Sequence, residues 1–92
     1  MKVYWFSGES GLREWIFAPT EARASELYAE VLIMSGAPAT KYWGREITSG
    51  AVVDAHRAFF EAAVTLNEEG FGEFDPSTGW TIISLAERIQ KL

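Results

Sequence analysis

The chain has 92 residues, of which 48% are hydrophobic, and its 13 acidic and eight basic residues give a net charge of −5. This length predicts one domain with a single core over residues 1–92, and the composition excludes a disordered chain and a membrane-spanning one. The absence of cysteine excludes disulfides and thiolate metal sites, and it favours a reducing cytoplasm as the compartment. Because the net negative charge opposes phosphate binding, we expect no direct contact with nucleic acid.

The first 18 residues predict a β-hairpin. Residues 3–7 and 12–18 are rich in aromatic and β-branched side chains, and the segment Gly8-Glu9-Ser10-Gly11 between them is typical of a four-residue turn. Because side chains alternate along a strand, Val3 and Trp5 should face one side and Tyr4 and Phe6 the other. Both faces are then apolar, so either helices cover both of them or one aromatic face is left for a partner.

Two helices follow, separated by a segment for which the sequence allows either a strand or a loop. Thr20 is suited to cap the first helix, which Gly36 and Pro38 should end; its apolar residues recur at helical spacing: Ala24, Leu27, Tyr28, Val31 and Leu32. Residues 37–48 fit either a short edge strand or a structured loop. A longer amphipathic helix should follow Gly50, include Glu68 and Glu69 in its last turn, and stop at Gly70.

The last quarter of the chain predicts a second hairpin and a short helix. Residues 71–74 and 80–84 flank the turn residues 75–79, in which proline starts the turn and glycine supplies a positive φ. Ser84 and Glu87 form a capping box for a helix over residues 85–91. The expected fold is α+β: an antiparallel sheet of about four strands from two β-hairpins, packed with two longer helices and a short C-terminal one.

Catalytic and metal-binding motifs are scarce. His56 is the only histidine, and Asp54 lies two residues before it, where a helix does not let the two side chains meet. His56 therefore fits the edge of an apolar helix face better than a catalytic site, and the carboxylates around it have no metal-ligand spacing. We expect a chain that is not an enzyme and needs no cofactor or metal.

Two groups of residues are candidates for partner binding. Glu68 and Glu69 should be disfavoured by the helix dipole, and with Glu73 and Asp75 they should gather four carboxylates at one end of the molecule. A solvated, frayed helix end explains the same pattern without function. The second group is Tyr42 and Trp43, flanked by Lys41 and Arg45; it fits a contact hot spot, or equally a loop whose rings cap the core.

The opening of the chain resembles small phage and mobile-element proteins. Residues 1–6, 14–18 and 20–22 carry this resemblance, which covers about the first third of the chain. In its overall profile the chain is similar to phage-encoded inhibitors of host defence, such as anti-CRISPR proteins. This resemblance implies a protein that binds and blocks a nuclease or another nucleic-acid-binding complex, and it names no functional residue.

Three functions are therefore under consideration. The leading hypothesis is a non-enzymatic, protein-binding inhibitor in the host cytoplasm, which uses the four carboxylates, Tyr42, Trp43 and Arg45 against a basic partner surface, with no membrane contact. The second is a homodimeric structural or accessory module that self-associates through the first hairpin. The third is a small enzyme that uses His56.

Overall fold

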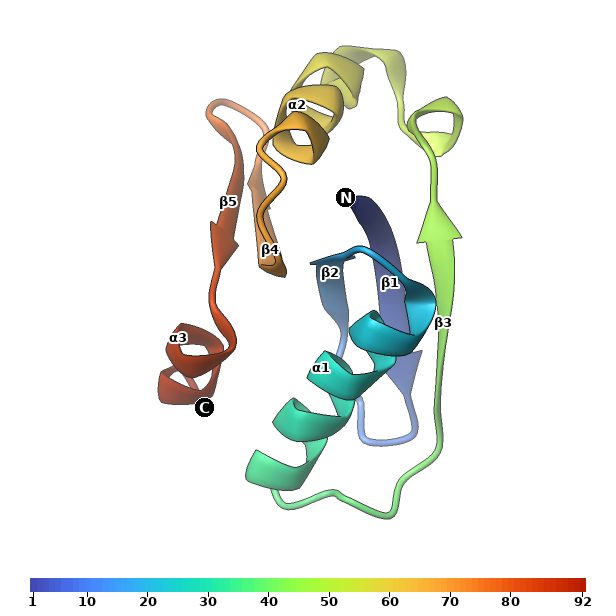
Figure 1. Ribbon diagram of the computed structural model, residues 1–92, viewed down its shortest axis with the longest axis vertical. Helices are drawn as coiled ribbons and strands as arrows, with labels where there is room; N and C mark the ends of the chain where they lie inside the picture. The colour runs from blue at the N-terminus through green and yellow to red at the C-terminus, as the bar shows by residue number, and fades with distance from the viewer.

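The computed structural model describes residues 1–92 and has the expected α+β class, built around one antiparallel sheet (Figure 1). The sheet has five strands in the order β3-β1-β2-β4-β5. Their bounds are Lys2–Gly8 for β1, Glu14–Ala18 for β2, Tyr42–Ile47 for β3, Gly70–Asp75 for β4 and Gly79–Ile83 for β5. Two predicted hairpins, β1-β2 and β4-β5, thus lie side by side in one sheet.

Helices cover both faces of this sheet. Helix α1 (Glu21–Met34) lies across β1, β2 and β3, and the short helix α3 (Leu85–Gln90) packs beside it (Figure 1). A 3-10 turn, η1 (Ser49–Ala51), leads to helix α2 (Asp54–Thr65), which packs on the opposite face and against β5. None of these helices has the length and hydrophobicity needed to cross a bilayer.

The expected single core is divided into two layers. On the α1 side, 11 buried residues pack together, among them Tyr4, Phe6, Ile16 and Tyr28. On the α2 side, the buried residues are Val3, Phe17, Ile47, Phe60 and Ala63. The alternation of side chains predicted for the first hairpin is confirmed, and of its two explanations the cover of both faces by helices holds for most of the sheet.

Three predictions from short sequence patterns are confirmed: two helix N-caps and one glycine in a turn. The Thr20 side chain accepts a hydrogen bond from Arg23 N and caps α1. Ser84 accepts one from Glu87 N and caps α3, and Gly79 has a φ of 93° at the end of the β4-β5 turn. The first turn is longer than predicted, because β2 begins at Glu14 and not at residue 12.

The sheet has one strand more than predicted. Residues 42–47, for which strand and loop were both open, form the edge strand β3, which pairs with β1 along its whole length. Gly44 makes this pairing compatible with the core, since a Cβ there would overlap the ring of Phe6. Pairing with β1, which is distant in sequence, therefore makes residues 42–47 a strand and not a loop.

The end of the long helix was predicted wrongly. Helix α2 ends at Thr65, and Asn67, with a φ of 55°, supplies the left-handed residue expected at Gly70. Asparagine tolerates this conformation better than most residues. Gly70 instead begins β4, where a Cβ would overlap the carbonyl oxygen of Ile83. Glu68 and Glu69 therefore lie beyond the helix, and the predicted repulsion from its dipole does not arise.

Candidate functional site

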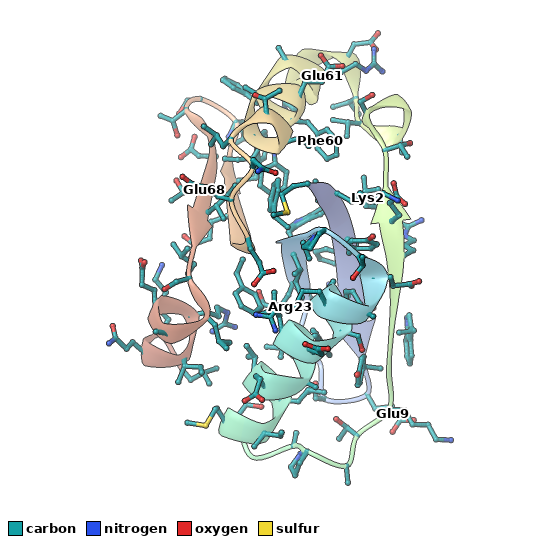
Figure 2. All side chains as sticks on the ribbon, viewed as in Figure 1. Lys2, Glu9, Arg23, Phe60, Glu61 and Glu68 are labelled. Atoms are coloured by element: carbon teal, nitrogen blue, oxygen red, sulfur yellow. The ribbon has the colours of Figure 1, made fainter.

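The four carboxylates expected to form one acidic patch do not gather. Glu68 and Glu69 precede β4 and Asp75 ends it, so the strand holds them apart by about 20 Å. Figure 2 shows Glu68 near the linker between α2 and β4, far from Glu9 at the opposite end of the molecule. The prediction of one acidic end is wrong, because β4 runs away from the residues that precede it.

Two of these carboxylates are neutralised by cations from distant parts of the chain. Glu69 Oε1 accepts hydrogen bonds from Arg23 Nε at 3.0 Å and Nη2 at 2.8 Å. Glu73 Oε1 accepts one from Lys91 Nζ at 2.7 Å. The hydrogen bonds that Arg23 donates to Glu69, and then the one it donates to Glu26, raise the pKa of Arg23. A basic partner would have to displace these cations before it could use either carboxylate.

Asp75 has a local role in the β4-β5 turn. Its Oδ1 accepts hydrogen bonds from the Ser77 hydroxyl at 2.6 Å and from Ser77 N at 2.8 Å. These bonds, the hydroxyl first, lower the pKa of Asp75 below its ordinary value. Its carboxylate thus stabilises the turn, while a role of any of the four carboxylates in binding stays a prediction.

The aromatic candidates of β3 lie on opposite faces of the sheet. Tyr42 faces α1: its hydroxyl lies 2.7 Å from Ser25 Oγ and its ring centroid 4.9 Å from that of Tyr28. Trp43, one residue along, faces the other side and is 60% exposed. Tyr42 is thus part of the packing under α1, and only Trp43 and Arg45 remain on the surface.

The register of the sheet brings further tryptophans next to this surface. Trp5 of β1 lies opposite both Arg45 of β3 and Trp15 of β2. The rings of Trp5 and Trp15 are 4.6 Å apart between centroids, and both residues are half-buried. Trp43 is the diagonal neighbour of Trp5 across the β1-β3 pair, and the Cα atoms of such neighbours are typically about 7–8 Å apart. Three indoles on three adjacent strands therefore share one part of the α2 face.

Helix α2 packs over the other end of this face, and Trp5 and Trp15 lie at the margin of its layer, where they pack against its buried residues. Its layer includes Val3, Phe17 and Ile47, which are register partners in one row across three strands. Figure 2 shows Phe60 directed from α2 toward the start of β1, close to this row. Two rows further along, Trp43 is opposite Ser7, and neither residue belongs to the buried layer under α2.

The basic side chains fall into two groups, those that form ion pairs and those that do not. Five of the eight basic residues form ion pairs: Lys2 with Glu46, Arg23 with Glu26 and Glu69, Arg57 with Asp54, Arg88 with Glu14, and Lys91 with Glu73. The other three, Arg13, Lys41 and Arg45, have no carboxylate partner and are exposed.

These three cations lie at the uncovered end of the α2 face. Arg45 is in β3, while Lys41 and Arg13 immediately precede β3 and β2 at the same end of the sheet. Tyr42 and Glu14, the next residues, face the α1 side, so the alternation of the chain directs Lys41 and Arg13 to the other side. We call this surface the open sheet end; it comprises Trp5, Trp15, Trp43, Arg13, Lys41 and Arg45.

His56 is packed as an aromatic residue. Its ring centroid lies 4.8 Å from that of Phe74, and Asp54 pairs with Arg57 instead. It lines an apolar cavity of about 160 Å³ with Trp15, Val52, Val53, Phe74 and Trp80, and the buried Nε1 of Trp80 has no acceptor. No three histidine or acidic side chains come together as metal ligands. The enzyme hypothesis thus lacks an orienting partner for the imidazole.

Part of the open sheet end was predicted from the sequence. The sequence patterns pointed to Trp43 and Arg45 together with Tyr42, and to the apolar α2 face, but they did not connect the two or include Arg13. The missing information is the β1-β3 register, which alternation alone does not provide. Comparison of the chain with protein-family models, with curated proteins and with solved structures found no match.

Proposed function

We propose that the chain is a non-enzymatic binding protein that contacts a macromolecular partner through the open sheet end. The observation that supports this proposal is the position of the three cations that have no carboxylate partner. Lys41 and Arg45 flank the 60% exposed Trp43 in sequence, and Arg13 lies at the same end of the sheet before β2, whereas the other five basic side chains are paired. Exposed tryptophan and arginine side by side are typical of binding hot spots.

The narrower form of this proposal is an inhibitor of a host complex that handles nucleic acid, as the resemblance to anti-CRISPR proteins implies. In this form the inhibitor contacts the complex with the open sheet end. Glu69 and Glu73 contribute little, because Arg23 and Lys91 already occupy them.

The test is affinity capture from a cytoplasmic lysate with the tagged protein, its Trp43→Ala variant and its Met34→Ala variant. Met34 is 56% exposed at the end of α1 and serves as the matched control for loss of an exposed apolar side chain. We expect one specific complex, identified by mass spectrometry, to be retained by the wild type and by Met34→Ala and lost with Trp43→Ala. Equal recovery with both variants contradicts the proposal.

One observation favours a second candidate, the homodimeric module. Strand β3 is an edge strand, so its outer backbone groups are free to pair with the same strand of another copy. Self-association through the aromatic face of the first hairpin stays a prediction, because the two sheet neighbours of each hairpin strand occupy its edges and not this face. Light scattering at high protein concentration tests it, and a monomer would reject it.

A further inference from the structure

We infer that the open sheet end binds a single-stranded nucleic acid, an inference that rests on the proposed function and names the class of partner. It reverses the expectation from net charge, because that expectation treated the charge of the chain as evenly distributed. The structure separates the charges: the paired cations lie elsewhere, and the unpaired ones meet three tryptophans on one surface.

The three indoles form a platform suited to unstacked bases. Their backbones are hydrogen-bonded in adjacent strands, so the rings are held in place before a ligand arrives. Trp43 is 60% exposed and offers most of its ring, while Trp5 and Trp15 support each other at 4.6 Å and remain half-buried. Aromatic side chains on a sheet surface bind single strands because every base has a face to stack on.

The cations complete the site for a phosphate backbone. Arg13, Lys41 and Arg45 are exposed and flank the indoles from two strands. No carboxylate neutralises them; Glu46, next to Arg45, faces the other side and pairs with Lys2. Glu9 lies close to Lys41, since its backbone N donates to Lys41 O at 2.9 Å, but its carboxylate forms no ion pair. Phosphates can therefore approach all three cations.

Other anionic partners fit this surface less well. An acidic peptide would satisfy the cations, but only its aromatic residues could stack on the indoles. A nucleic-acid duplex keeps its bases stacked inside, where the tryptophans cannot reach them. In a single strand every nucleotide carries both a phosphate for the cations and a base for the rings.

The experiment measures fluorescence anisotropy of labelled oligo(dT) and oligo(U) of about 12 nucleotides, a length within the site sizes of single-strand binding domains. We expect both strands to bind at about 50 mM salt, and the affinity to fall about twentyfold at about 200 mM if all three cations contact phosphates. A difference between the two strands distinguishes DNA from RNA as the source. A duplex of the same length should bind more weakly.

Matched variants separate this site from general electrostatic attraction. Trp43→Ala should weaken binding about tenfold or more, since one stacked base is lost. Arg45→Gln should weaken it severalfold, whereas Lys91→Gln, which removes the same charge beside Glu73 on the other face, should leave it unchanged. Circular dichroism of each variant checks that the fold is retained.

The inference is overturned if the wild type binds neither strand at low salt, or if Trp43→Ala and Lys91→Gln bind as the wild type does. The proposed function can survive that result. If a protein complex is still captured in a Trp43-dependent manner from a nuclease-treated lysate, the open sheet end binds a protein and only the nucleic-acid inference fails.

Discussion

The two faces of the sheet differ in how their charged side chains are neutralised and in how far their aromatic side chains are covered. On the α1 face, the one buried charged residue is Glu14, 7% exposed, and Arg88 of α3 donates to it at 2.6 Å. On the α2 face, the Val3 row is buried, whereas Trp43 at the other end is 60% exposed and the cations Arg13, Lys41 and Arg45 have no carboxylate partner. A closed face must neutralise its charges, whereas an open one can leave them to water and to a ligand.

The largest effect should come from removing a ring where α2 closes its face. Phe17 is fully buried, with its ring centroid 5.6 Å from that of Trp80. Phe17→Ala should lower the free energy of unfolding by about 3–5 kcal/mol, because it deletes apolar contacts and leaves a cavity. Urea denaturation measures this change. A loss below about 1 kcal/mol would mean that α2 does not close this end of the face.

The ion pair on the α1 face should come next. Arg88→Leu leaves the Glu14 carboxylate buried without a partner, and we expect a loss of about 3 kcal/mol. Lys91→Leu, at the residue that follows the same helix, is the matched control: its pair with Glu73 is about half exposed, so the loss should be at most about 1 kcal/mol. Equal losses by urea denaturation would show that the two faces do not differ in this respect.

The pH dependence of stability should report the same carboxyl group. Burial raises the pKa of Glu14 above 4.5, and the hydrogen bond from Arg88 only partly opposes this. Between 4.5 and the raised pKa, the folded state holds a proton that the unfolded state has released, so stability falls as pH rises.

The slope of this fall is at most about 1.4 kcal/mol per pH unit, the limit for a difference of one bound proton. Glu14→Gln removes the titrating group, so the difference in unfolding free energy between wild type and variant should change over this window and be constant above it. A difference that does not vary with pH would show that Glu14 is ionised alike in both states.

The smallest effect on stability is expected at the open sheet end. Trp43→Ala removes a side chain that is 60% exposed, so the free energy of unfolding should change by about 0.5 kcal/mol or less. The melting temperature should accordingly stay close to that of the wild type. A large loss would show that Trp43 is part of the core, and it would weaken the case for a free binding surface.

Local interactions were sufficient to predict much of the fold. Caps at Thr20 and Ser84, the positive φ at Gly79 and the alternation along β1 all depend on residues a few positions apart. Such signals are present in the sequence itself, because a turn or cap uses only its own neighbours. The end of α2 was predicted wrongly because either asparagine or glycine can supply the left-handed residue after a helix, and here Asn67 does so instead of Gly70.

The candidate site depended on contacts that no local pattern contains. Arg23 meets Glu69 across 46 residues of chain, and Arg88 meets Glu14 across 74. The sequence by itself determined an acidic, aromatic-rich chain without cysteine and, through its turns, caps and periodicity, the α+β class. Only the tertiary structure decided which cations are neutralised and which three remain free beside the tryptophans, because strand register and helix docking set the distances between charges.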